Sequence, residues 1–426
     1  MTDRPLTRNI DLNRGPLDIA GYEAADGYQS MHAIAKGLSP DDVLNIVKKS
    51  GLKGRGGAGF PTGLKWSFVP RGDGSPAQKY LVVNADEMEP GTFKDRLLME
   101  GDPHLLIDGM LVAAYTIQAN MAYIFLRGEY IDAENVLKKA VKEAYQRGYL
   151  GKNILGTGFD LDIVLHTSAG RYICGEETAL LNALEGKRAN PRAKPPFPQV
   201  SGLWGKPTIV NNVETLCNLP GILAYGVDWY QGLSRGVDHG TKMFGVSGKV
   251  KNPGCWELPL GTPVRELLEG HAGGMRDGLE LRAFLPGGGS TDFMLPRHLD
   301  LNLDYDEIGK AGSRLATGTM IVLDDQTCPV GMVGNLMTFF AHESCGFCTP
   351  CRDGLPWVDE IFRGFEAGTG NVKDLQILHD HIEYLGPGRT FCALAPGATA
   401  PLGSGLKYFA EDFEKHITEQ RCPYKH

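Results

Sequence analysis

The chain has 426 residues, of which 42% are hydrophobic and 22% charged, and its formal net charge is −8. This length predicts two to four domains rather than one compact core, and the composition is that of an ordinary globular protein. The negative charge argues against nucleic acid as a partner, although it leaves room for a local basic site. The N-terminal residues lack an apolar signal segment, and no apolar run reaches the ~20 residues of a membrane span.

The first half of the chain alternates patterns typical of strands and helices. A helix is predicted after Ser39, with Pro40 at its first position and Gly51 beyond its end. A glycine-rich loop follows, and then strands and helices alternate at 80–86, 105–119, 121–127, 131–148 and 161–166, with a further helix near Glu176. This alternation predicts a parallel sheet, whose ligands bind beyond the carboxyl ends of the strands. Residues 84–87 and 169–178 fall at such ends.

The second half of the chain shows two other patterns. Short strands are predicted at 242–248, 255–261 and 281–287 around one helix at 262–274, which indicates a small α+β insert of β-grasp-like character. Four helical segments with short connections then predict an antiparallel four-helix bundle, at 328–342, 354–367, 371–385 and 402–417.

Four cysteines are the most specific chemical signal. Cys345, Cys348 and Cys351 stand at Cys-x2-Cys-x2-Cys spacing, and Cys392 precedes the last predicted helix. Three thiolates at this spacing reach three corners of an iron–sulfur cubane, and a remote fourth closes it. A zinc site more often shows paired Cys-x2-Cys knuckles, and a disulfide framework requires a short secreted chain. We therefore expect a [4Fe–4S] cluster and, with the other five cysteines scattered, a reducing cytoplasm.

The glycine-rich loop at 51–63 is a candidate anion site. Gly54, Gly56 and Gly59 match G-x-G-x-x-G, but the loop follows a helix and runs into Pro61, which is the wrong context for a dinucleotide-binding turn. Glycines still let successive amides point at an anion, and Arg55 and Lys65 add positive charge. The alternative is a flexible surface loop.

A basic run interleaved with aromatic residues and prolines is the second anion candidate. It comprises Lys187, Arg188, Arg192, Lys194 and Lys206. In an acidic redox protein, an anionic nucleotide is a better guest for it than nucleic acid. Glu176 and Glu177 begin a helix, so they either complement its dipole or hydrogen-bond the hydroxyls of a ribose.

Several long motifs together resemble one family. GLKGRGGAGFPTGLKW, NADEMEPGTFKDR, AGRYICGEETALLNALEG, NNVET and ESCGFCTPCRDG are similar to the NADH-oxidising, FMN-carrying subunits of bacterial respiratory complex I, the F subunits of NADH:quinone oxidoreductases, over residues 37 to 417. The resemblance implies an N-terminal segment (1–62), a Rossmann-like FMN and NADH domain (63–235), a ubiquitin-like domain (236–325) and a four-helix bundle with a [4Fe–4S] cluster (326–426).

The resemblance also implies the binding residues. FMN is expected at Gly54, Arg55, Gly56, Gly57, Lys65, Asn84, Asp86, Tyr172, Gly175, Glu176, Glu177, Asn211, Asn212 and Thr215. NADH is expected at Gly59, Phe60, Lys65, Phe68, Glu87, Glu89, Glu177, Lys194 and Phe197, and the cluster at the four cysteines. Met88 stands where many relatives have serine, and the stretch after Cys392 departs from the family pattern, so flavin contacts at Ala393 and Leu394 are not expected with the rest.

The implied activity is that of an NADH dehydrogenase. A hydride passes from NADH to FMN, and electrons pass singly to the cluster and on toward quinone, with no acid, base or nucleophile required of the chain. The implied partners are the thioredoxin-like [2Fe–2S] subunit and the large multi-cluster iron–sulfur subunit, in a peripheral arm on the cytoplasmic face of the inner membrane. Two alternatives remain. One is the diaphorase subunit of a soluble NAD-linked hydrogenase or formate dehydrogenase, and the other is a scaffold without flavin. Where the chain begins and ends favours complex I over the diaphorases, which often carry fused domains.

Overall fold

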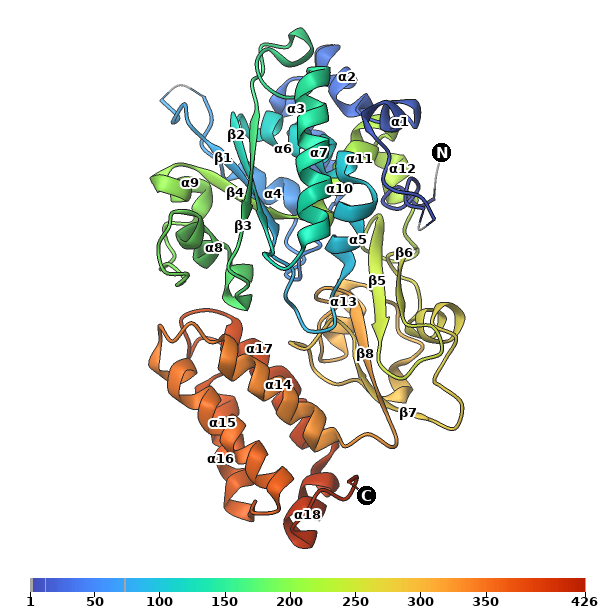
Figure 1. Cartoon of the computed structure of the whole chain (residues 1–426), viewed down its shortest axis with the longest axis vertical. Coiled ribbons are helices and arrows are strands. Elements are labelled where there is room, and N and C mark those ends of the chain that lie inside the picture. Colours follow the sequence, from blue (N-terminus) through green and yellow to red (C-terminus); the bar gives the residue numbers. More distant parts are fainter. Residues whose placement is uncertain (1–2, 12, 73, 426) are drawn as a thin grey trace.

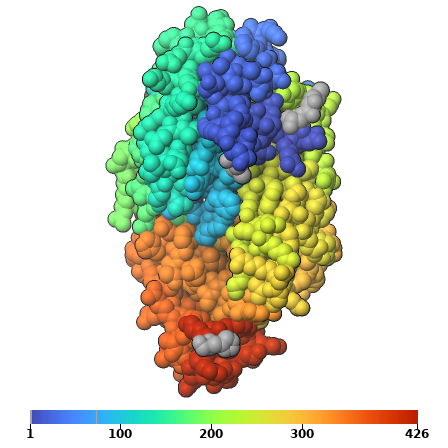
Figure 2. All heavy atoms as spheres, turned by 45° about the vertical axis from the view of Figure 1, so that its right-hand side comes forward, coloured from blue at the N-terminus to red at the C-terminus, as the bar shows by residue number. Residues whose placement is uncertain are grey.

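The computed structural model describes residues 3–11, 13–72 and 74–425. A parallel sheet wrapped by helices occupies the upper part of the molecule, a second sheet lies below it, and a helical bundle forms the lower end (Figure 1). The N-terminal segment lies against the upper helices, and the C-terminal residues lie at the far end of the bundle (Figures 1 and 2). Within the described residues, no helix combines the length and the apolar character needed to span a membrane.

The upper sheet is parallel throughout, as predicted. Its strand order is β3-β2-β1-β4, with β1 Tyr80–Ala85, β2 Met121–Leu126, β3 Asp162–Thr167 and β4 Thr208–Asn212. Asn84 of β1 lies opposite Phe125 of β2 and Asn212 of β4, so the carboxyl ends of the strands lie at one edge. Strand β4 was not predicted, because only five residues separate Pro207 from the following helix.

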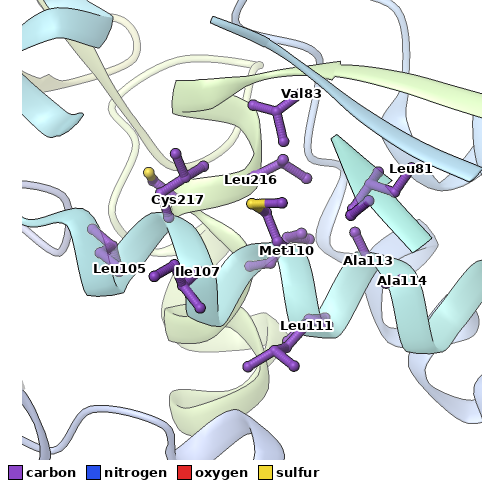
Figure 3. Packing of buried hydrophobic residues seen from close by; sticks show 14 of the residues in the cluster. Leu81, Val83, Leu105, Ile107, Met110, Leu111, Ala113, Ala114, Leu216 and Cys217 are labelled. Atoms are coloured by element: carbon purple, nitrogen blue, oxygen red, sulfur yellow. The ribbon is translucent and has the colours of Figure 1, made fainter. Parts of the chain in front are cut away.

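Helices cover both faces of this sheet. In Figure 3 the apolar side of α6 packs Met110, Leu111 and Ala113 near Leu81 of β1 and Leu216 of α10. The predicted start of α3 is confirmed: Ser39 forms a capping box with Asp42, and Gly51 ends the helix at φ 69°. The helices and short 3-10 turns of this part are α1 Ile19–Ala24, α2 Gln29–Ala35, α3 Pro40–Ser50, α4 Thr62–Ser67, α5 Lys94–Gly101, α6 Pro103–Ile117, α7 Ile131–Arg147, η1 Ile154–Gly156, η2 Tyr172–Gly175, α8 Glu177–Leu184, α9 Pro198–Ser201, η3 Leu203–Gly205, α10 Val213–Cys217, α11 Leu219–Tyr225 and α12 Val227–Gln231.

The second sheet has the order β6-β5-β8-β7, with parallel central strands and antiparallel edges. This is the predicted ubiquitin-like, β-grasp arrangement. The strands are β5 Thr241–Ser247, β6 Gly254–Pro259, β7 Leu281–Leu285 and β8 Thr319–Asp324. Strand β8 was not predicted, and the predicted helix at 262–274 is only the π-helical turn η4 Glu266–His271. The remaining helices here are η5 Pro296–His298 and α13 Tyr305–Lys310.

The lower end is the predicted bundle, with changed helix ends. It contains α14 Pro329–Glu343, α15 Thr349–Ala367, α16 Val372–Tyr384, α17 Leu394–Tyr408 and α18 Ala410–Glu419. The single helix predicted at 402–417 is wrong, because the chain forms two helices that break at Phe409. Pro396 and Pro401 made the start of α17 resemble a loop in the sequence, yet both prolines lie within the helix.

One apolar cluster joins the three parts of the molecule. It includes Val82 and Phe125 on one face of the parallel sheet, Leu285 and Leu323 of the second sheet, and Phe340 of the bundle. The opposite face of the parallel sheet belongs to a separate cluster that includes the N-terminal helices. The cysteine-bearing bundle is therefore packed directly onto the parallel sheet.

Candidate functional site

The structure brings the four predicted cluster cysteines together. Cys348 is the N-cap of α15, Cys351 lies buried in the first turn of that helix, and Cys392 lies just before α17. The four cysteines surround a hollow with about 230 Å³ of empty space, walled otherwise by Ile173, Pro191, Phe347, Phe391 and Leu394. A thiol-rich, largely apolar hollow of this kind fits the cysteine ligation of an iron–sulfur cluster.

Burial keeps the thiols protonated until a metal takes their place. Burial raises the pKa of Cys351 to about 12 and the pKa of Cys392 to about 11. Ser344 Oγ lies 3.1 Å from Cys351 Sγ and opposes this rise by hydrogen bonding. Such thiols give up their protons to iron rather than to water, so the donor set is suited to a bound cluster.

The glycine-rich loop lies on the segment 211–215. Gly54 N donates to Phe60 O at 2.9 Å, and Arg55 N donates to Thr215 Oγ1 at 2.8 Å. A Cβ at Gly56 would lie 2.9 Å from Asn212 Cβ, so only glycine permits this contact. Gly57 has φ 132° and open space where a Cβ would stand, so its backbone is accessible to a ligand.

The Arg55 side chain does not contribute charge to the open side of the loop. Its guanidinium is fully buried and donates to Tyr230 Oη at 3.0 Å and to the carbonyls of His239 and Thr241 at 2.8 and 3.1 Å. The guanidinium therefore ties the loop to the second sheet. As a direct cofactor contact, Arg55 stays a prediction.

Gly59 also lies against the second sheet. It has φ 63°, and a Cβ there would stand 2.7 Å from the Tyr305 ring. The Tyr305 hydroxyl donates to Gly54 O at 2.9 Å. Glycine is therefore required at 59 for packing as well as for any nucleotide contact.

Lys65, Glu176, Glu177 and Lys194 form one charged group at the carboxyl edge of the sheet. Lys65 Nζ lies 2.9 Å from Glu177 Oε2 and donates to Val210 O at 2.9 Å. Lys194 Nζ lies 3.1 Å from both Glu176 Oε1 and Glu177 Oε1. Burial opposes ionisation of Glu177, but the two lysines outweigh it and lower its pKa. Two cations next to two carboxylates can exchange partners with a phosphate.

Glu176 serves both of the roles that its sequence position allowed. Its carboxylate accepts from the amides of Thr178 and Ala179 at 2.9 Å each, which caps α8. The other oxygen, Oε1, contacts Lys194.

Polar atoms at the ends of β1 and β4 face the same edge. Asn84 Nδ2 donates to Gly175 O at 3.3 Å, and Asp86 Oδ1 accepts from Ser168 Oγ at 3.1 Å. Asp86 Oδ2 is buried and has no hydrogen-bond partner among the described residues. Burial raises the pKa of Asp86 to about 7. An unpartnered buried oxygen costs free energy unless a ligand donor reaches it, and open space beside Gly175 leaves room for one.

Asn211 and Asn212 also belong to the frame of this edge. Asn211 Oδ1 accepts from Trp66 Nε1 at 2.8 Å, and Asn212 caps α10 while donating to Asp95 Oδ2 at 2.6 Å. Their side chains thus hold α4 and α5 against the end of β4. As ligand contacts, they stay predictions.

Glu87 and Glu89 lie apart from the charged group of Lys65, Glu176, Glu177 and Lys194. Glu87 accepts from the amides of Asp95 and Arg96 at 2.9 and 3.1 Å, so it caps α5, and burial raises its pKa to about 7. Glu89 accepts from the Tyr172 hydroxyl and from Ser290 N, each at 2.7 Å, and burial raises its pKa. Both carboxylates already have protein donors, so their predicted contacts with the nucleotide would have to replace or share them.

Three of the predicted nucleotide contacts are exposed phenylalanines. Phe60 is 46% exposed, and Phe68 and Phe197 are each 52% exposed. Large aromatic side chains rarely remain this open without a role. Flat apolar rings are suited to stacking on a base.

The predictions missed a buried charge network under the loop. Glu214 lies 2.8 Å from Lys94 Nζ and 3.3 Å from Lys242 Nζ, and all three are buried. Lys242 Nζ also donates to Arg55 O at 3.4 Å. Glu214 lies within NNVET, but its neighbours Lys94 and Lys242 are far away in the sequence, so no local pattern reveals the network.

The turn η2 connects the two sites. Ile173 forms part of the wall of the cysteine hollow, while Gly175, two residues on, accepts from Asn84 at the end of β1. Tyr172 stacks edge-on against Phe339 and Phe340 of α14. A group held at the sheet edge is thus separated from the cysteines by a single turn of chain.

A glycine loop and paired charges at the edge of a parallel sheet, one turn from four clustered cysteines, define a flavin-dependent iron–sulfur electron-transfer protein. Family models agree: the Nuo51 FMN-binding domain matches residues 47–221, the SLBB domain 243–292, and the NADH-ubiquinone oxidoreductase-F iron-sulfur binding region 331–416. The predicted FMN and [4Fe–4S] cofactors and the predicted fold are confirmed at this level.

Curated relatives support the same family. The chain is 58% identical to the NADH-quinone oxidoreductase F subunit of Escherichia coli (strain K12), over 97% of this chain and 93% of the relative. It is 48% identical to the second such protein, the NADH-quinone oxidoreductase F 2 subunit, of Rhizobium meliloti (strain 1021), over 100% of both chains. The chain belongs to the family of NADH-quinone oxidoreductase F subunits.

A solved structure shows a similar fold in another assembly. A chain of the NAD+-reducing [NiFe]-hydrogenase in the H2-reduced state superposes with a TM-score of 0.79 at 34% identity. The match covers 90% of this chain, and this chain spans 63% of the length of that one. The air-oxidized state of the same type of enzyme gives a TM-score of 0.78 at 35% identity.

Proposed function

We propose that this chain is the NADH-oxidising subunit of a respiratory NADH:quinone oxidoreductase, taking a hydride from NADH onto FMN and sending electrons singly through a [4Fe–4S] cluster toward quinone. The observation that carries the proposal is turn η2, which forms a wall of the cysteine hollow through Ile173 and contacts the sheet edge through Gly175. Electron transfer requires two redox groups close together, and this turn supplies that proximity.

The roles of the residues follow from their contacts. The backbone of Gly56 and Gly57 and the ammonium groups of Lys65 and Lys194 would hold phosphates, and Asp86 Oδ2 would accept from the flavin ring or its ribityl chain. When bound, FMN supplies hydride acceptance and one-electron release. The chain itself positions the groups and excludes water, and it need not move a proton.

Recognition of NADH would divide between stacking and charge. Phe60, Phe68 and Phe197 offer exposed rings for the adenine, and Glu177 lies among the basic side chains at the same edge. A carboxylate near the adenosine ribose accepts hydroxyl donors and repels a 2′-phosphate. This arrangement would favour NADH over NADPH.

Membership of the family implies partner subunits. We assign to this chain a thioredoxin-like [2Fe–2S] subunit and a large multi-cluster iron–sulfur subunit, in a peripheral arm on the cytoplasmic face of the inner membrane. Phe347 and Phe391, which stack edge-on and are half exposed at the cysteine hollow, support a contact through which electrons leave. Affinity purification of the full chain from its own cells tests this assignment, since recovery of membrane subunits is expected.

The similarity to the NAD+-reducing hydrogenase keeps a second candidate, the diaphorase subunit of a soluble NAD-linked enzyme. The same purification separates the two, because hydrogenase or formate dehydrogenase subunits in place of membrane subunits would overturn the first. An anaerobic NADH titration of the purified chain tests the activity itself. Bleaching of flavin absorbance followed by the EPR signal of a reduced cluster is expected. A bleached flavin with a cluster that stays oxidised would refute internal electron transfer.

A further inference from the structure

A second group of metal-ligand side chains lies at the far end of α14 from the cluster cysteines. It consists of Cys328, Glu366, His416 and Cys422, and the four ligand atoms all lie within 4.8 Å of one another. Cys328 precedes α14 and Cys345 follows it, so the 15-residue helix separates the two groups by roughly 22 Å. Cys328 and Cys422 are two of the cysteines that the sequence pattern left scattered.

The distances in this group match a tetrahedral ion. Cys328 Sγ lies 3.4 Å from His416 Nε2 and 3.7 Å from Glu366 Oε1, and His416 Nε2 lies 3.6 Å from Glu366 Oε1. Zinc bonds of about 2.3 Å to sulfur and about 2.0–2.1 Å to nitrogen or oxygen, at tetrahedral angles, give ligand separations of about 3.3–3.6 Å. The four side chains therefore already stand near the corners that one zinc ion requires.

Neighbouring groups orient each ligand toward the common centre. His416 Nδ1 lies 2.6 Å from Asp412 O, a contact in which the ring nitrogen donates and leaves Nε2 free to ligate. Gly331 N donates to Cys328 Sγ at 3.2 Å, and the position at the start of α14 favours a thiolate. Lys425 Nζ contacts Glu366 Oε2 at 2.7 Å, which directs Oε1 inward.

The charges also balance around a divalent cation. Two thiolates and one carboxylate carry three negative charges, and a zinc ion together with Lys425 supplies three positive ones. His416 is fully buried and Cys422 nearly so, while the Glu366 side chain is 25% exposed and gives the ion a route inward. A closed set of four protein ligands is typical of a structural zinc site rather than a catalytic one.

We propose that Cys328, Glu366, His416 and Cys422 bind one structural Zn²⁺ ion that fastens the C-terminal tail to the start of the bundle. Binding replaces the two thiol protons, which pass to solvent, and no electron is transferred. The ligands come from the N-cap of α14, the last turn of α15, α18 and the tail beyond it, so one ion joins the first and last elements of the bundle. The proposal stands independently of the proposed function.

The test begins with the full chain, purified anaerobically without chelators from cells grown with zinc. Zinc, iron and FMN are measured per chain, and about one zinc is expected beside the iron of the cluster. Cys422→Ala should lose the zinc and retain iron and FMN. Cys255→Ala, which removes a cysteine outside both groups, should retain all three. Cys345→Ala should lose iron and retain zinc.

X-ray absorption at the zinc edge of the unaltered protein decides the point even if the variants do not fold. Two sulfur and two lighter ligands are expected, at about 2.3 Å and about 2.0–2.1 Å. Four sulfur ligands would mean zinc in the cluster site and would overturn the proposal. Zinc-free protein with full iron, zinc retained in Cys422→Ala, or a Cys328–Cys422 disulfide in a non-reducing peptide map would each overturn it as well.

Discussion

The buried network under the glycine loop gives a sharp prediction for Glu214→Gln. The side chain keeps its size but loses its charge, at a position with no exposed surface. Lys94 retains a pairing with Asp95 at 2.7 Å. Among the residues that the structure describes, Glu214 is the only acidic partner of Lys242, so this buried ammonium loses its counter-charge.

The expected loss of stability is large. Removing one partner of a buried ion pair costs about 3–5 kcal/mol, which corresponds to a fall of about 6–20 °C in the melting temperature of a unit of this size. Burial already lowers the pKa of Lys242 to about 8, and loss of Glu214 lowers it further. Between that lower pKa and pH 8 the folded variant binds fewer protons than its unfolded chain, so its stability rises with pH. The wild type is flat there, and the difference narrows by at most about 1.4 kcal/mol per pH unit.

Differential scanning calorimetry at pH 6.5 and pH 8.5 measures both effects. Glu100→Gln is the matched control, since Glu100 pairs with Arg96 at 2.9 Å on the surface and should cost less than about 1 kcal/mol. Equal shifts for the two variants would refute the role of the buried network. A Glu214→Gln deficit that does not shrink at pH 8.5 would refute the part assigned to Lys242.

Three further predictions concern the cofactor sites. Cys351→Ala should abolish the cluster and electron transfer to the natural partner while FMN and NADH oxidation by a flavin-level acceptor survive; an unchanged cluster EPR signal would remove Cys351 from the ligands. Lys65→Ala should weaken flavin or NADH binding by about 1.5–3 kcal/mol, seen as lower FMN occupancy or a higher Michaelis constant, and the absence of both changes would contradict a phosphate contact. Glu177→Gln leaves Lys65 and Lys194 without this carboxylate and should raise the NADPH-to-NADH ratio of kcat/KM by about one to two decades, whereas a fixed ratio would leave specificity to other residues.

Local spacing explains which parts of the fold and site could be predicted. The cysteine motif encodes its geometry within seven residues, and Ser39, Pro40 and Gly51 encode both ends of α3. The alternation of strands and helices was equally local, so the parallel sheet could be predicted. In these cases the chemical signal and the structure it determines lie within one or two turns of chain.

Contacts between distant segments could not be predicted. The sequence identifies Arg55 as a cation beside a loop, but it does not show that the guanidinium points into the protein toward Tyr230. Glu214 and Lys242 meet across two domains, and Cys328 and His416 across the whole bundle. Strand β8 pairs with β5 and β7, and its six residues lack a distinctive pattern of their own.

The apolar cluster shared by the sheet and the bundle sets an order for events on the ribosome. Val82 and Phe125 are made early, yet they pack in the same cluster as Phe340 and Phe362 of the bundle, which are made last. One face of the nascent sheet therefore stays uncovered until residues 329–419 have been synthesised, and an uncovered apolar face is prone to aggregation. Delivery of iron and sulfur to the bundle falls in the same interval, so maturation of the cluster and closure of the flavin domain are coupled steps in making this protein.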